Sequence, residues 1–109
     1  MYTNDIMDVI KMMTPMIKSE IHDARDYAMK ALQLKEHHPD LADMLLKISE
    51  EEMGHMKRLH DGLAKLIEAY RQEKGDPPAP MLAVYDYLHK EQIADAAEVK
   101  TLQAMYTNA

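Results

Sequence analysis

The sequence predicts an all-α protein, and three observations support this prediction. The chain of 109 residues contains only 3 glycines and neither phenylalanine nor tryptophan, whereas methionine occurs 11 times. Residues that favour turns and strands are therefore scarce. Apolar residues make up 47% of the chain, as in globular proteins. Apolar positions also recur every three or four residues through three long segments. We expect one domain, 1–109, with helices at about 4–36, 40–73 and 80–106.

The first helix is expected to run from about Asn4 to Glu36. Pro15 interrupts it, so either the helix kinks there or Thr14 caps a new helix with Pro15 at its first position. We favour the kink. The apolar face is predicted to contain Ile6, Ile10, Met13, Ile17, Ala24, Tyr27 or Ala28, and Ala31.

The second and third helices are bounded by proline and glycine. Pro39 suits the first turn of the second helix, and Gly75 is expected to end it just before the prolines of "KGDPPAP". The apolar line of the second helix is predicted to be Leu41, Leu45, Ile48, Leu59, Leu63, Leu66 and Tyr70. The corresponding line of the third helix is Leu82, Tyr85, Leu88, Ala94 or Asp95, Val99, Leu102 and Tyr106.

Charge and cysteine content exclude several classes of function. The net charge is -6, from 13 basic and 19 acidic residues, and no basic cluster is available to bind nucleic acid or an anionic membrane. The absence of cysteine excludes disulfides and thiolate ligands, so any metal must be held by carboxylates and imidazoles. No apolar run approaches the roughly 18 residues of a membrane span, and we expect a soluble, cytoplasmic protein.

The stretch "ISEEEMGHMKRLH" places polar residues on an apolar line. Glu52 and His55 fall on the line of the second helix, while Glu51 turns away from it. Glu20 interrupts the apolar line of the first helix in the same way. An ionised carboxylate facing a core is unfavourable unless it is paired or bound to a metal.

These three residues are also expected to lie at one height. If the first two helices form an antiparallel pair, Glu20 and His55 both lie roughly 23 Å from the turn. Glu52 and His55 are neighbours on the helix surface because they are three residues apart. We therefore predict that Glu20, Glu52 and His55 bind a metal ion, with iron or manganese favoured and zinc as an alternative. Carboxylate sites with two metal ions need two copies of this set, so we expect a homodimer or a multiple of dimers.

The segments "SEIHDARDYAMKAL" and "LADMLLKISEEEMGHMKRLHDGL" resemble the first two helices of a rubrerythrin, in the ferritin-like superfamily. The matching residues are Glu20, Tyr27, Glu52 and His55, and the resemblance covers roughly residues 16–70. The arrangement, with the site completed across a dimer, is similar to that of the encapsulated ferritins. The resemblance implies two iron ions per dimer and ferroxidase or peroxide-scavenging activity, with the metal ligands as the only catalytic residues. The third helix has no second Glu-x-x-His, and no rubredoxin module is present, so electron delivery of the rubrerythrin type is in doubt.

Several alternatives remain open at the level of sequence. Tyr27 is a candidate hydrogen-bond partner of a ligand carboxylate, and Glu51 is either solvated or bridging. Glu98 lies near the height of His55 and is a candidate further ligand, or part of an acidic outer face. The remaining histidines are expected on the surface: His22, His37, His38, His60 and His89. The competing function is a structural module whose dimer buries a polar network without metal. Metal storage within a larger shell is a third possibility.

Overall fold

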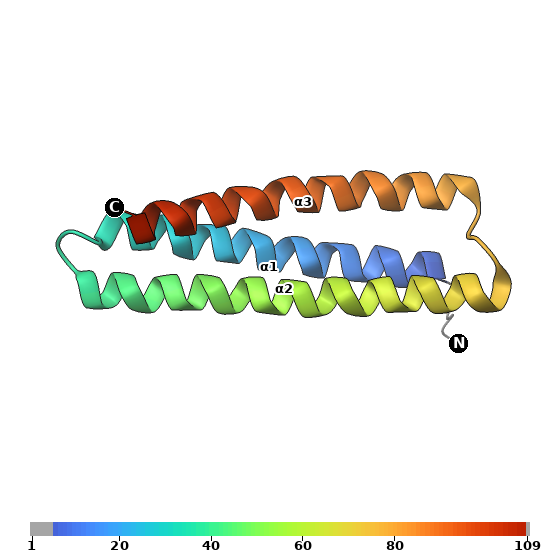
Figure 1. Ribbon diagram of the computed structural model, residues 1–109, viewed down its shortest axis with the longest axis horizontal. Coiled ribbons are helices and arrows are strands. Elements are labelled where there is room, and N and C mark those ends of the chain that lie inside the picture. Colours follow the sequence, from blue (N-terminus) through green and yellow to red (C-terminus); the bar gives the residue numbers. More distant parts are fainter. Residues whose placement is uncertain (1–5, 109) are drawn as a thin grey trace.

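The computed structural model describes residues 6–108, which form three long helices joined by short connections (Figure 1). Helix α1 covers Ile6–Leu34, α2 covers Pro39–Lys74 and α3 covers Ala79–Asn108. The expected all-α architecture is confirmed, and a helical hairpin followed by a third helix is compatible with it. The predicted start of the first helix at Asn4 lies outside the described residues.

Pro15 does not end the first helix. It lies inside α1, which continues on both sides of it as one helix. Thr14 does not cap a new helix, because its hydroxyl donates a hydrogen bond to the carbonyl oxygen of Ile10, one turn earlier, at 2.7 Å. The alternative of a fresh helix start at this point is therefore wrong.

The ends of α2 follow from local sequence. Pro39 occupies the first turn, where its missing N–H leaves no hydrogen bond unmade. At the other end Gly75 has a φ of 81°, a conformation that glycine adopts without steric cost. The N–H of Gly75 donates to the carbonyl oxygen of Arg71, which closes the last turn.

Helix α1 is the central helix. Both α2 and α3 pack along it, whereas the backbones of α2 and α3 approach each other at few points. Figure 1 shows α1 between its two neighbours, with the last turn of α3 beside the α1–α2 connection. The predicted apolar face is confirmed at its fully buried positions and is only half-buried at Met13 and Tyr27. The buried residues are Ile6, Ile10, Ile17, Ile21, Ala24, Ala28 and Ala31.

Helix α2 buries a different line from the one expected. Its buried residues are Ala42, Ser49, Leu63 and Ile67. The predicted line shares only Leu63 with this set, and its members Leu41 and Leu66 are 45% and 41% exposed. The two lines differ by roughly one residue, or about 100° around the helix. The sequence contains two adjacent apolar lines on α2: the fully buried one faces the other two helices, and the predicted one is half-buried at Leu45, Leu59 and Tyr70, which pack against the buried clusters.

Helix α3 also departs from its predicted pattern. Val99 and Tyr106 are buried, as expected, but Ala94 and Asp95 are exposed. The other predicted members are half-buried: Leu82, Tyr85, Leu88 and Leu102. Because α3 packs mainly on α1, a narrow apolar strip is enough for this contact, and the rest of the helix faces solvent.

A chain of buried hydrogen bonds joins all three helices. Ser49 of α2 is fully buried, and its hydroxyl donates to the carbonyl oxygen of Ala24 in α1 at 2.6 Å. The side-chain amide of Gln103 in α3 donates to the Ser49 oxygen at 3.0 Å. This chain satisfies a polar group that would otherwise be costly to bury, and it links α2 to α3 without close backbone contact.

The C-terminal end of α3 is held by a second polar contact. The Tyr106 hydroxyl donates a hydrogen bond to Asp43 of α2, and the Lys35 ammonium donates to the Tyr106 carbonyl oxygen. The hydrogen bond to Asp43, together with burial and the charge of Asp43, raises the pKa of Tyr106 to about 12. Tyr106 therefore stays protonated and keeps donating throughout the physiological range.

The molecule is long and thin. Its extents are 56 × 26 × 18 Å and its radius of gyration is 17.0 Å, whereas a compact domain of this length has a radius of about 13 Å. The accessible surface is 7460 Å², against about 6,200 Å² for a typical folded monomer of this mass. The chain thus leaves more surface exposed than a compact monomer does. None of the helices described within 6–108 combines the length and apolar character needed to cross a bilayer.

The buried hydrogen-bond chain predicts the effect of Ser49→Ala. This change removes the hydroxyl and leaves the Gln103 amide without its partner, so it should lower the free energy of unfolding by about 1–3 kcal/mol. Urea unfolding at one fixed protein concentration measures the loss. Thr101→Ala is the matched control, because the Thr101 hydroxyl donates to the carbonyl oxygen of Ala97 on an exposed turn of its own helix. Equal losses in the two variants would contradict a structural role for the Ser49 contact.

Candidate metal centre

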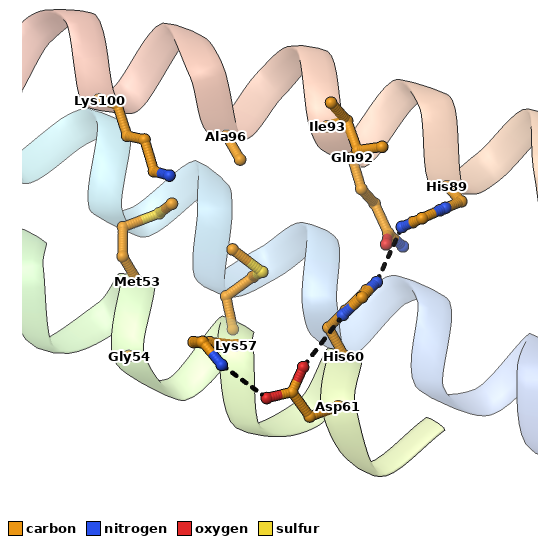
Figure 2. Close-up of a pocket in the computed structure, with 11 residues that line it drawn as sticks. Met53, Gly54, Lys57, His60, Asp61, His89, Gln92, Ile93, Ala96 and Lys100 are labelled. Carbon is orange, nitrogen blue, oxygen red and sulfur yellow. Dashed lines mark hydrogen bonds and ion pairs between the residues drawn. The ribbon is translucent and has the colours of Figure 1, made fainter. Parts of the chain in front are cut away.

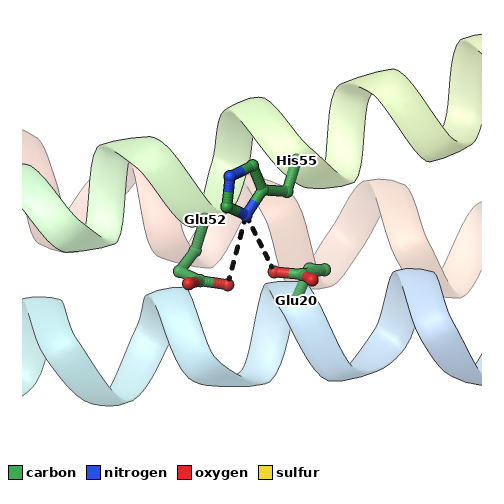
Figure 3. A group of neighbouring side chains, drawn as sticks. All are labelled: Glu20, Glu52 and His55. Atoms are coloured by element: carbon green, nitrogen blue, oxygen red, sulfur yellow. Dashed lines mark ion pairs between the residues drawn. The ribbon is translucent and has the colours of Figure 1, made fainter.

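Three side chains from α1 and α2 meet near the middle of the hairpin. Glu20 projects from α1, and Glu52 and His55 project from α2 one turn apart (Figure 3). One ligand atom from each residue lies within 4.8 Å of the others. The predicted convergence of Glu20, Glu52 and His55 is thus present, because the residues are level along the antiparallel pair and in phase around each helix.

His55 lies between the two carboxylates. Its Nδ1 atom is 3.6 Å from Oε2 of Glu20 and 3.9 Å from Oε2 of Glu52. Both distances exceed a hydrogen bond, so the three groups surround a small space without closing it. The side chain of His55 is 54% exposed, against 27% for Glu20 and 21% for Glu52. The carboxylates therefore form the floor of the cluster, and the imidazole forms its solvent-facing edge.

One oxygen of this cluster is buried without a partner. Oε2 of Glu20 is shielded from solvent and has no hydrogen-bond donor among the described residues. The nearby Glu52 cannot supply one while it is ionised, because a carboxylate only accepts hydrogen bonds. Leaving a buried carboxylate oxygen unsatisfied is costly. Either a proton or a cation between the carboxylates would remove this cost.

The pKa of Glu52 reflects the same conflict. The approach of the Glu20 carboxylate, with which Glu52 can share a proton in a hydrogen bond, is the largest cause that raises the pKa of Glu52, followed by burial and by the negative charge of Glu20. The charge of His55 acts in the opposite direction and lowers it. Without metal, the pair of carboxylates therefore favours a shared proton.

The remaining candidates do not join this cluster. Glu98 of α3 makes an ion pair with Arg25, with Nε and Oε1 3.0 Å apart. Positions 20 and 25 point about 140° apart on α1, so Arg25 and Glu98 lie on a different flank of that helix from Glu20. Glu51 is exposed. Tyr27 is half-buried and lines a shallow depression with Asp23, Asp26 and Lys30, so its contact with a ligand carboxylate stays a prediction.

Two histidines expected on the surface are instead paired. His60 of α2 and His89 of α3 are half-buried, and their Nε2 atoms are 2.8 Å apart. His60 lies four residues after Met56 and three before Leu63, on the line of α2 that faces the inside. That spacing could have shown from the sequence that His60 lies on the buried side of α2. The partner could not be found in the same way, because it depends on where α3 lies.

Comparisons of the chain with protein-family models, curated proteins and solved structures gave no match. The functional assignment therefore rests on the chemistry and geometry of the cluster itself.

The shared proton predicts a pH-dependent effect of Glu52→Gln in metal-free protein. A raised pKa means that folded Glu52 holds its proton to a higher pH than the unfolded residue, whose ordinary value is 4.5. Its stabilising contribution is complete below that value and is lost as the pH rises through the folded-state pKa. Glutamine copies the protonated form, so the variant should be more stable than the native protein at pH 7 and equal to it near pH 4.

Urea unfolding in the presence of a chelator, at both pH values, measures this difference. Glu50→Gln is the control, since Glu50 is exposed two residues away and should change stability little at either pH. A Glu52→Gln variant that was less stable than the native protein at pH 7 would show that the carboxylates do not repel each other as described.

Proposed function

We propose that this protein binds two iron ions in a site shared by two chains, and that it oxidises iron(II) with O₂ or peroxide. The observation that carries the proposal is the convergence of Glu20, Glu52 and His55 around a buried oxygen that lacks a donor. Two carboxylates and one imidazole form a mostly hard ligand set, which suits iron or manganese and also accepts zinc.

The ligand set of one chain is half of a dinuclear site. Carboxylate bundles that bind two metal ions use one glutamate from each of two helices and Glu-x-x-His from each of two more. This chain supplies one glutamate from α1 and one Glu-x-x-His from α2. A two-fold axis beside the cluster would bring a second copy of each, because every contact in such a dimer is repeated by symmetry.

The surface around the cluster supports such a dimer. We call it the open face, and its apolar members from α2 are half-buried or exposed: Leu41, Leu45, Ile48, Leu59 and Leu66. On α1, Met16 is 46% exposed one turn before Glu20. Helical spacing puts the α2 residues on one side of that helix, together with Glu52 and His55. In Figure 3 the cluster lies in front of the α1–α2 pair, with α3 behind it.

The amount of exposed surface fits the same interface. The chain, with an accessible surface of 7460 Å², exposes about 1,300 Å² more than a typical monomer of its mass, and a standard interface buries about 800 Å² on each partner. An apolar face that stays exposed in one chain is expected to pack against the same face of a second chain in a symmetric dimer. Such a dimer would cover Leu41 and Leu66, the most exposed apolar residues of the second line of α2.

Each residue has a distinct role in this proposal. Glu20 and Glu52 supply negative charge and lie close enough to hold a cation between them. His55 supplies a neutral imidazole, with Nδ1 as the nitrogen that faces the carboxylates. Its exposure leaves one side of the cluster accessible to small molecules. Bound iron(II) would contribute one electron per ion to the reduction of O₂ or peroxide.

A dimer with a metal-free polar network is the competing function. It would use the same open face, with protons rather than metal ions between the carboxylates. The two functions differ in the effect of removing His55. Loss of an imidazole ligand abolishes metal binding, whereas a proton-sharing pair of carboxylates would survive the change.

Substitution of the three residues should therefore separate ligands from their neighbours. Glu20→Ala, Glu52→Ala and His55→Ala should each abolish stoichiometric binding of iron(II) and, with it, the oxidation of iron(II) by O₂. Anaerobic calorimetric titration measures binding, and the absorbance of iron(III) after addition of O₂ measures oxidation.

Glu50→Ala and Glu51→Ala are the matched controls, since both remove an exposed carboxylate from the same turn of α2. Both should keep the metal. If Glu51→Ala lost iron while Glu52→Ala kept it, the assignment of ligands on α2 would be wrong by one residue. If the native protein bound no iron, manganese or zinc, the metal-free function would replace the proposed one.

A further inference from the structure

Helices α2 and α3 enclose a groove on the side of the molecule that includes His60 and His89. We call it the α2–α3 groove. It has a volume of about 470 Å³, and its walls carry Met53 and Met56 from α2 and Ile93 and Ala96 from α3 (Figure 2). The groove exists because both helices pack on α1 while their own backbones approach each other at few points. None of its lining residues belongs to the cluster of Glu20, Glu52 and His55.

The two imidazoles of the groove point at one another. Their Nε2 atoms are 2.8 Å apart, the ring centroids are 4.8 Å apart and the ring planes differ by only 20°. The ring planes are therefore nearly parallel, and the two Nε2 atoms are within hydrogen-bond distance of each other. In the absence of an ion, one N–H must lie between them, because two facing lone pairs repel each other.

An acidic residue lies beside each imidazole, and for His60 it lies at the second ring nitrogen. Nδ1 of His60 lies 3.5 Å from Oδ1 of Asp61, whose other oxygen accepts a hydrogen bond from Lys57 at 2.8 Å. The negative charge of Asp86 acts on His89 from the preceding turn of α3. A carboxylate behind the second ring nitrogen is the usual support of a metal-binding histidine, because it fixes the ring and makes the free nitrogen a better donor.

Burial lowers the pKa of His89, and the neighbouring His60 lowers it further, against the opposing effect of Asp86. His89 is therefore neutral at physiological pH, which is the form that can bind a metal. Thioether sulfur is available on the same wall, since Met56 lies one turn before His60 and lines the groove. The groove thus offers imidazole nitrogen and thioether sulfur, beside the charged or polar side chains of Lys57, Asp61, Gln92 and Lys100.

We propose that His60 and His89 form a second metal site, which binds one copper(I) ion between their Nε2 atoms with Met56 as an additional ligand. Thioether and imidazole donors suit copper(I), whereas carboxylate and water suit harder ions. The site thus complements the carboxylate cluster, whose two carboxyl groups favour harder ions. Binding of copper(I) by His60 and His89 requires neither a dimer nor an ion in the carboxylate cluster.

A small movement opens the site. Metal–imidazole bonds are about 2.0 Å long, so two nitrogens that share an ion lie further apart than the observed 2.8 Å. Helices α2 and α3 must separate slightly here. This separation costs little free energy because their backbones contact each other at few points. Binding then replaces one shared proton with a metal bridge between α2 and α3, which should raise the thermal stability of the protein.

Anaerobic titration of the full chain with copper(I), in competition with a chromogenic chelator, tests this site. The native protein should bind one copper(I) per chain and melt at a higher temperature when loaded. His60→Gln and His89→Gln should each lose both the binding and the rise in melting temperature. Asp61→Asn should weaken binding by roughly 10- to 100-fold, since it removes the carboxylate behind His60. Met56→Leu should weaken binding while leaving the metal-free melting temperature nearly unchanged.

Two controls make the result specific. His22→Gln removes a histidine that is also beside an aspartate, Asp26, but is 65% exposed and distant from the groove, and it should bind copper(I) normally. Glu52→Gln alters only the carboxylate cluster and should also bind normally. Copper(I) binding that survived in both His60→Gln and His89→Gln would show adventitious binding to surface methionines and would overturn the proposal. Tighter binding of zinc(II) than of copper(I) would overturn the assignment of the ion.

Discussion

The proximity of two carboxylates, Glu20 and Glu52, is the constraint on which the interpretation of this molecule depends. Both are largely shielded from solvent, and one oxygen of Glu20 has no donor within the described chain. Two such groups cannot both remain ionised at low cost unless positive charge lies between them. The fold holds them together nevertheless, because the apolar contacts of α1 and α2 fix the register of the hairpin. Repulsion between the two carboxylates thus opposes the apolar packing of α1 against α2. Such a conflict is the pattern expected where a site serves a function.

The three helices divide the surface of α2 into two apolar lines with different roles. The inner line, which includes Ser49 and Leu63, meets α1 and α3 and stabilises the single chain. The other line, which includes Leu41 and Leu66, remains accessible beside the carboxylate cluster. A single chain with this arrangement leaves apolar side chains exposed beside the carboxylate cluster, where a second copy would cover them. The polar site and the apolar face are adjacent on the same helix, so dimerisation and metal binding would reinforce each other.

Sequence alone located the cluster because two local rules were sufficient. Helical phase placed Glu52 and His55 together, and equal distance from the α1–α2 turn placed Glu20 beside them. The predicted line of α2 is correct at Leu63 but misses the other fully buried positions, because periodicity cannot decide which of two adjacent apolar lines is buried more deeply against α1. The pairing of His60 with His89 was missed for another reason. The two residues lie at unequal distances from the α2–α3 connection, so the rule of equal distance from a turn does not bring them together. The link between Ser49 and Gln103 likewise required the position of α3.

Native mass spectrometry after anaerobic addition of iron(II) tests most directly whether the cluster is half of a shared site. The spectrum reports the number of chains and the number of ions in the same particle. A site completed across a two-fold axis predicts that two iron ions appear together on particles of two chains, or of a multiple of two, and that single chains carry none. Single chains that bind iron stoichiometrically through Glu20, Glu52 and His55 would contradict it.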